Sequence, residues 1–161
     1  MQGLYLWGSY FPSVETEGRS DNWRHIARND KEYKRAAGKL ITAAQRGQEG
    51  RMVIQIHRLL EKRQELLFVS PTIEDVYAQS LDTLYHTYGE MIEHIQSQKN
   101  RSQWREDISR KKMLNLQRRQ AELADEIGNF LVSSCLTTDT NSVQRVSQSC
   151  KRFFAYDFPL V

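Results

Sequence analysis

The chain has 161 residues, a length typical of one domain, and its 23 basic and 20 acidic residues give a formal net charge of +3. Hydrophobic residues make up 39% and charged residues 27%, with only 8 glycines and 3 prolines, which excludes collagen-like, linker-like and strongly disordered chains. The longest apolar runs are far shorter than the ~18 residues of a membrane span, so we expect no transmembrane helix. The first residues lack a basic region and a small-residue cleavage site, which predicts a cytoplasmic protein.

The N-terminal part combines an aromatic segment with a long amphipathic helix. Residues 4–11, LYLWGSYF, predict a short extended segment, and residues 12–19 predict a loop that begins at a proline. Ser20 and Asp21 are suitable N-cap residues for a helix that continues to Arg46, because apolar residues then recur at the spacing of one helical face.

Two further helices are expected in the middle of the chain. Glycines bracket residues 47–50 and predict a turn, after which a second helix continues to about Leu67 and forms a hairpin with the first. Ser70 and Pro71 suit the N-cap and the first position of a third helix, because proline lacks only an amide hydrogen that the first turn leaves unpaired. That helix should end near Ser97.

The last third of the chain predicts two more helices. Ser102 can cap a fourth helix that continues to about Leu136. Its apolar residues are Met113, Leu116, Leu123, Ile127 and Phe130. After the polar residues 137–142, a fifth helix carries Val143, Val146, Cys150 and Phe153 on one side, and the chain ends in the apolar tail FFAYDFPLV.

These elements predict an all-α protein, an antiparallel bundle of about five helices with short apolar extended termini. We expect one helical domain over residues 1–161, with an extended N-terminal segment at 1–19, the bundle at 20–156 and a C-terminal tail at 157–161. Either the apolar termini dock across the bundle, which we favour, or they contact other protein subunits, copies of this chain included.

The sequence carries no catalytic signature. It has no GxSxG, Walker-type, GxGxxG or HExxH motif, so we expect a protein that is not an enzyme and has no cofactor. His86, Glu90 and Glu93 share a helix face, but the Glu-x-x-His motif of di-iron bundles is missing, so we interpret this face as solvated acidic surface rather than a metal site. Cys135 and Cys150 lack metal or disulfide spacing and are expected to be reduced structural residues.

Charge is strongly segregated along the chain. Residues 24–46 hold seven basic and two acidic residues, a net charge of +5, and residues 99–119 hold eight basic and two acidic residues, a net charge of +6. Residues 72–96 hold five acidic residues and neither lysine nor arginine. Such asymmetry indicates what kind of partner a protein attracts and says little about its fold.

The basic residues of the first helix fall on one face. At ~100° per residue, six of them lie within an arc of about 80° opposite the apolar face. They are Arg24, Arg28, Lys31, Arg35, Lys39 and Arg46, here called the α1 stripe. At ~1.5 Å per residue this stripe is roughly 33 Å long, and a nucleic acid presents phosphates continuously over such a length.

The fourth helix provides a second basic ridge. Its residues are Trp104, Arg105, Lys111, Lys112, Arg118 and Arg119. Cations interleaved with an aromatic residue suit a single strand, whose bases stack while the cations follow the backbone. Alternatively, Trp104 packs on a neighbouring helix, the cations are merely solvated, and the acidic third helix neutralises one of the basic segments. We favour contact with DNA or RNA backbone without sequence readout, because no helix-turn-helix pattern is present.

The last two predicted helices, LADEIGNFLVSSC and SVQRVSQSCKRFFAYDF, support a family resemblance. With Phe130 and Leu131 before a polar loop, and Cys150 and Phe153 after it, this third of the chain resembles the small helical subunit of CRISPR surveillance complexes of the Cascade type. The resemblance implies an antiviral defence subunit that stacks in a filament and holds guide and target strands apart. The family has no diagnostic motif, so no functional residue is carried over.

We therefore expect a non-catalytic helical subunit that contacts nucleic-acid backbone within a multi-subunit complex. The competing interpretation is a helical adaptor or scaffold module whose charge-striped faces bind an acidic protein.

Overall fold

The protein is described from a computed structural model, which covers residues 14–63, 71–98, 103–136 and 142–159. Backbone alone is described at 14–23, 26, 63, 103–106 and 134–136. The described residues form five helices and no strand, which confirms the all-α prediction. The helices are α1 (Val14–Gln45), α2 (Glu49–Arg63), α3 (Ile73–Gln96), α4 (Gln103–Leu136) and α5 (Ser142–Phe153).

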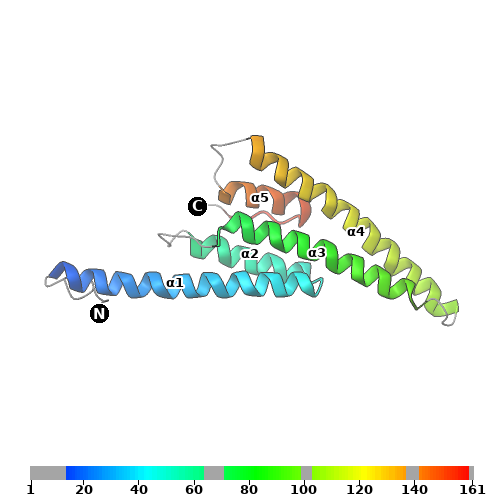
Figure 1. The fold of residues 1–161 in the computed structure, drawn as a ribbon, viewed down its shortest axis with the longest axis horizontal. Coiled ribbons are helices and arrows are strands. Elements are labelled where there is room, and N and C mark those ends of the chain that lie inside the picture. The colour runs from blue at the N-terminus through cyan, green and yellow to red at the C-terminus, as the bar shows by residue number, and fades with distance from the viewer. Residues whose placement is uncertain (1–13, 64–70, 99–102, 137–141, 160–161) are drawn as a thin grey trace.

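The five helices form two helical hairpins, α1–α2 and α3–α4, and α5 packs against the second hairpin (Figure 1). α1 packs most extensively on α2 and α3, and α3 packs on α4. α3 and α4 diverge from their shared loop, and α5 lies between them, in contact with both. α1 has 32 residues and α2 only 15, so α1 extends beyond its partner toward the N-terminus.

The turn between α1 and α2 is closed by a Schellman motif. Gly47 has a φ of 66°, the left-handed conformation that glycine adopts without steric cost. The amide of Gln48 donates to the carbonyl of Ala43 at 3.0 Å. The amide of Gly47 donates to the carbonyl of Ala44 at 3.1 Å. The predicted turn at 47–50 is therefore confirmed in its first half, and Glu49 already begins α2.

The start of α3 differs from the prediction. Thr72 is the N-cap, and its side chain accepts a hydrogen bond from the amide of Asp75 at 3.2 Å, so Pro71 lies outside the helix. The reason is a tertiary contact: the hydroxyl of Tyr33, a fully buried side chain on α1, donates to the carbonyl of Pro71 at 2.8 Å. Ser70 lies outside the described residues. The predicted end of this helix is confirmed, because Ser97 is its C-cap.

The start of α1 also differs from the prediction. The helix begins at Val14, so the loop expected at 12–19 is wrong from Val14 onward, and Ser20 and Asp21 lie inside the helix instead of capping it. Acidic residues favour the first turns of a helix through its dipole, and the chain has Glu15 and Glu17 there. The predicted extended segment at 4–11 lies outside the described residues.

All five helices contribute to one apolar core. Its fully buried members include Leu40, Met52, Ile56, Leu84 and Val146. Among the predicted apolar positions of α4, Leu123 and Phe130 are buried, whereas Met113, Leu116 and Ile127 are half-buried. All four predicted apolar residues of α5 are buried, and Cys150 is a free thiol with no exposed surface.

The C-terminal tail folds back onto the bundle. α5 ends at Phe153, three residues before the predicted end of the helical region. Ala155 has a φ of 54°, and the chain then reverses, so that the tail runs back beside α5 (Figure 1). Phe158 is 4% exposed. Its ring packs edge to face on the ring of His57 of α2, with 5.6 Å between the ring centroids. Residues 154–159 therefore dock on the bundle, and the buried Phe158 is not exposed for contact with another subunit.

Candidate nucleic-acid interface

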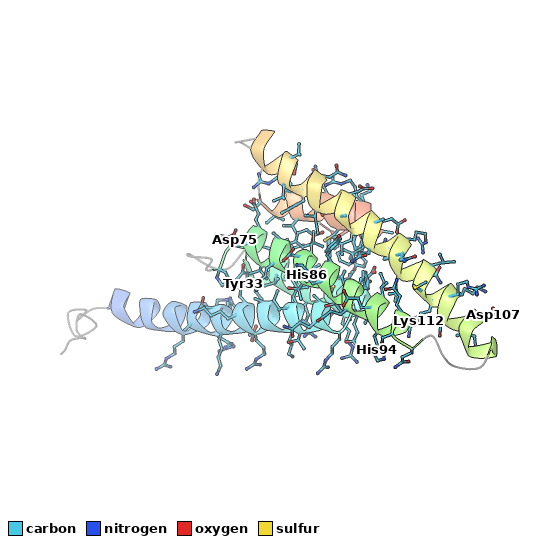
Figure 2. The ribbon with its side chains drawn as sticks, turned by 45° about the vertical axis from the view of Figure 1, so that its right-hand side comes forward. Tyr33, Asp75, His86, His94, Asp107 and Lys112 are labelled. Carbon is cyan, nitrogen blue, oxygen red and sulfur yellow. The ribbon has the colours of Figure 1, made fainter. Side chains whose placement is uncertain are left out.

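The six cations of the α1 stripe are all exposed. They lie on the solvent-exposed side of α1, where Arg35 and Lys39 border α2, and Figure 2 shows nitrogen-tipped side chains projecting from α1 into solvent. The opposite side carries Tyr33, Leu40 and Ala44, which are buried in the core. Burial of the apolar face therefore places the basic face in solvent, as the angular pattern predicts.

The cations of the α1 stripe lack partners among the described residues. None of them forms a salt bridge with a described carboxylate. By contrast, the nearby Lys34 pairs with Asp30 at 3.1 Å, and Lys62 of α2 pairs with Glu32 at 2.7 Å. The hydrogen bond from Lys62 is the main reason why the pKa of Glu32 is lowered, and the charges of Arg28 and Arg35 add to it. The stripe therefore keeps its positive charge available for a polyanion.

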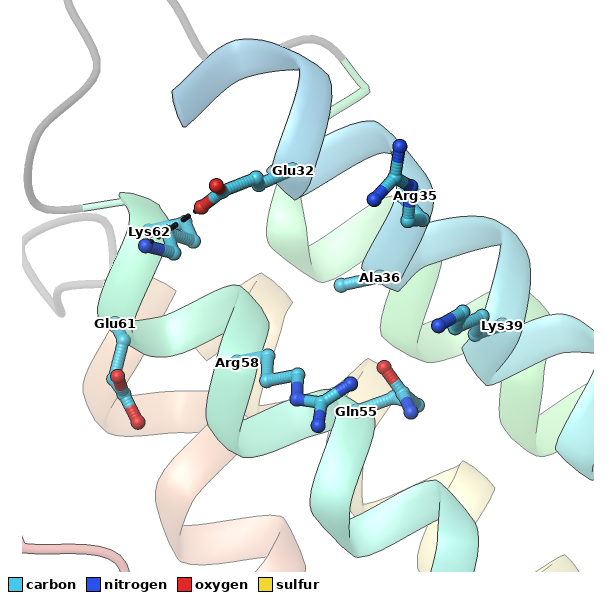
Figure 3. A pocket seen from close by; sticks show the side chains of 8 residues that line it. All are labelled: Glu32, Arg35, Ala36, Lys39, Gln55, Arg58, Glu61 and Lys62. Atoms are coloured by element: carbon cyan, nitrogen blue, oxygen red, sulfur yellow. Dashed lines mark ion pairs between the residues drawn. The ribbon is translucent and has the colours of Figure 1, made fainter. Parts of the chain in front are cut away.

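A groove between α1 and α2 continues the stripe onto the second helix (Figure 3). It has a volume of about 360 Å³. Its lining residues are Glu32, Arg35, Ala36, Lys39, Gln55, Arg58, Glu61 and Lys62. The lining holds four cations and two carboxylates, and each carboxylate is paired: Glu32 with Lys62, and Glu61 with His57 at 3.0 Å.

The α4 ridge is only partly placed. Lys111, Lys112 and Arg118 are exposed, and Arg118 pairs with Glu122 at 3.2 Å. The side chains of Trp104 and Arg105 lie outside those that are described. α1 and α4 form opposite edges of the bundle in both views, so the two basic segments are not brought together into one surface.

Arg119, one of the predicted site residues, has hydrogen-bond partners within the bundle. Its guanidinium donates to Glu49 at 2.6 and 2.9 Å and to the carbonyl of Phe153 at 2.7 Å, and it lies 3.7 Å from the centre of the Phe153 ring. The hydroxyl of Tyr88 donates to the same carboxylate. Burial disfavours the ionised form of Glu49, but the hydrogen bonds from Arg119 and Tyr88 outweigh it and lower the pKa of Glu49. Arg119 therefore joins α4 to α2 and α5, and a nucleic acid cannot use these hydrogen bonds.

The acidic third helix does not neutralise either basic segment in the described part of the chain. Glu74 pairs with Arg145 of α5, whereas Asp75, Asp82, Glu90 and Glu93 are exposed. A buried carboxylate, Glu126 of α4, is 4% exposed and accepts hydrogen bonds from Arg152 at 2.9 and 3.0 Å. Glu74 and Glu126 therefore pair with arginines of α5 and not with the α1 stripe.

The histidines and cysteines provide no metal centre among the described side chains. Among the described residues, no group of three or more His, Cys, Asp or Glu residues is placed to hold a metal ion. His86 is exposed and lies 3.6 Å from Asp82 of its own helix. Burial raises the pKa of the Cys150 thiol to about 12, which disfavours the reactive thiolate.

The sequence-based prediction did not include the α2 residues that line the groove. Gln55, Arg58 and Lys62 recur at helical spacing on the side of α2 that faces the groove. This i, i+3, i+7 spacing was present in the sequence, but the charge of α2 is spread over a short helix and is less conspicuous than that of α1.

The sequence matches no family model, and no curated protein or solved structure matches the chain. The resemblance to the CRISPR small subunit therefore stays a prediction. Among the described helices, none is both long enough and apolar enough to cross a membrane.

Proposed function

We propose that this chain is a non-catalytic helical subunit that contacts nucleic-acid backbone without sequence readout as part of a larger assembly. The main support is the α1 stripe, six exposed cations along about 33 Å of helix with no salt bridge to any described residue. Side chains that contact phosphates position a protein on nucleic acid, and their affinity depends strongly on salt.

The test is fluorescence anisotropy of labelled single-stranded and double-stranded oligonucleotides across a salt series. Arg24→Gln, Arg28→Gln and Lys31→Gln are combined in one variant, because these three cations lie on the stripe and outside the α1–α2 groove. Each lost phosphate contact should reduce the log-log salt slope by about 0.9 on duplex or 0.7 on single strand, so we expect a slope smaller by about 2 to 3.

The matched control is Lys34→Gln, which removes one charge from the same helix but off the stripe, where Lys34 already pairs with Asp30. We expect it to retain the wild-type affinity. Failure of the wild-type chain to bind any oligonucleotide at low salt would reject the proposal. Equal losses per charge in the control and the triple variant would reject the stripe as the contact surface.

Participation in an assembly is supported by a second surface, on α4. Leu114, Leu131 and Val132 are 57%, 54% and 55% exposed. With the exposed residues Ala121, Ala124 and Gly128 they fall within an arc of about 100° on the solvent side of the helix, interrupted by the exposed Gln117. An apolar helix face of this kind is typical of a protein interface. It also favours the second candidate function, a helical adaptor, if the basic stripe proves to bind acidic protein.

A specific version of the proposal is a small subunit of a Cascade-type CRISPR complex, based on the sequence resemblance. In this version several copies stack along the nucleic acid. Sedimentation velocity with single strands of increasing length should then show one additional copy per added length of strand. A single bound copy on every length would contradict stacking and leave the backbone-binding proposal intact.

A further inference from the structure

The α1–α2 groove contains three cations that have no salt-bridge partner among the described residues. Arg35 and Lys39 lie one turn apart on α1, and Arg58 extends from α2 on the opposite side. In Figure 3, Lys39 and Arg58 both extend toward the amide of Gln55. Cations from two helices thus line one concave site.

The carboxylates of the groove compensate these three charges only in part. Glu32 is held by Lys62 at 2.7 Å, and Glu61 is held by His57 at 3.0 Å, at the edge of the groove. The lining keeps an excess of two positive charges without counting His57. Such a site favours a compact anion, and guanidinium groups match the paired oxygens of a phosphate particularly well.

Gln55 adds an uncharged polar group to the groove. Its Oε1 is buried and has no hydrogen-bond partner within the described part of the chain. A buried polar atom without a partner is unfavourable, so the protein alone does not fully satisfy this carboxamide. Its other end, Nε2, carries two N–H groups, and an anion bound between Lys39 and Arg58 can accept hydrogen bonds from them.

We infer that this groove binds a phosphate group of the nucleic-acid backbone, with Arg35, Lys39 and Arg58 as the charged contacts and Gln55 as a hydrogen-bond donor. The inference rests on the proposed function and deepens it, because it makes α2 a part of the interface and gives the strand a path. The strand follows the α1 stripe from Arg24 and crosses onto α2 at the groove.

The test combines Arg58→Gln and Gln55→Ala, each measured by oligonucleotide anisotropy with the full chain. Arg58 is exposed and forms no salt bridge with a described residue, so Arg58→Gln should not unfold the protein. We expect Arg58→Gln to weaken binding about five- to twenty-fold and to reduce the salt slope by about 1. Gln55→Ala should weaken binding about two- to five-fold with an unchanged slope, since it removes no charge.

Lys151→Gln is the matched control, because it removes one exposed positive charge on α5, outside the groove. An effect of Arg58→Gln no larger than that of Lys151→Gln would overturn the groove assignment. If the α1 triple variant still lost affinity, the proposed function would survive this result. If the wild-type chain bound no oligonucleotide at all, both would fall together.

Two competitors identify the class of ligand. Poly-glutamate that displaced the oligonucleotide as well as an unlabelled oligonucleotide did, at equal charge concentration, would overturn the phosphate assignment in favour of an acidic protein. Inorganic pyrophosphate should compete at high concentration with the wild-type chain and less well with Arg58→Gln. Stoichiometric binding of pyrophosphate that a long oligonucleotide could not displace would indicate a small-molecule site and overturn the backbone assignment.

Discussion

Arg119 of α4 holds Glu49 of α2 through hydrogen bonds of 2.6 and 2.9 Å while its guanidinium lies on the ring of Phe153 at the end of α5. Both charged side chains are about 25% exposed, so the pair is largely removed from water. Arg119 thus links the start of α2 and the end of α5 to the middle of α4. This contact joins segments 70 residues apart in the sequence.

Arg119→Ala should destabilise the protein by about 2 kcal/mol, because Glu49 then loses its counter-charge and the ring of Phe153 loses a cation–π contact. The neighbouring Arg118 forms an exposed pair with Glu122, so Arg118→Ala should cost less than about 0.5 kcal/mol. Urea unfolding followed by circular dichroism at 222 nm measures both. Under conditions where Arg119→Ala is fully folded, its oligonucleotide affinity should match that of wild type within about twofold, and a large loss would return Arg119 to the nucleic-acid interface.

The Glu49 contact should make stability depend on acid pH. The pKa of Glu49 is lowered in the folded state, so its stabilising contribution is complete above the pKa of the unfolded chain, about 4.3, and is lost as the pH falls through the folded value. The stability difference between wild type and Glu49→Gln should therefore be largest at neutral pH and shrink as the pH is lowered through and below about 4. Unfolding curves at pH 7, 4 and 3 test this, with Glu90→Gln on the exposed side of α3 as the control. A difference that stayed constant over this range would contradict the assignment.

Two glycines of α1 and its following turn should respond in opposite ways to the same substitution. Gly47 has a left-handed backbone, and a Cβ placed there would lie 2.8 Å from Cε of Met91, so Gly47→Ala should cost about 1–2 kcal/mol. Gly38 lies within the helix with open space around the position of a Cβ, so Gly38→Ala should stabilise by about 0.5–1 kcal/mol. Thermal melts of the two variants provide the comparison. Stabilisation by Gly47→Ala would mean that the turn does not require the Schellman geometry.

The helical architecture could be predicted because it depends on local patterns. Apolar residues at helical spacing located all five helices, and the end of α3 at Ser97 and the end of α4 at Leu136 agree with the prediction. The start of α3 differs from the prediction because the hydrogen bond from Tyr33 to Pro71 is a tertiary contact, which the local sequence at Ser70 and Pro71 does not reveal.

The candidate site was predictable to the extent that it lies on one helix. The α1 stripe follows from 3.6-residue periodicity, since the buried face fixes which side is exposed. The pairing of Arg119 could not be predicted, because its partner Glu49 lies 70 residues earlier and a charge run does not reveal which member is paired. The groove was missed because its cations come from two antiparallel helices, and only the packing of α1 on α2 brings Arg58 opposite Lys39.

Docking of the C-terminal tail can be tested through its last buried aromatic residue. Phe158 is 4% exposed, and its ring contacts those of His57 and Tyr156, whereas Tyr156 itself is 37% exposed. Phe158→Ala should destabilise the protein by about 3 kcal/mol, the lower end of the range for a buried phenylalanine, because Phe158 lies in a non-helical segment that can relax around the cavity. Tyr156→Ala should cost less than about 1 kcal/mol. Urea unfolding of both variants decides the matter: a loss below about 0.5 kcal/mol for Phe158→Ala would show that the tail is not part of the core and leave it free to contact another subunit.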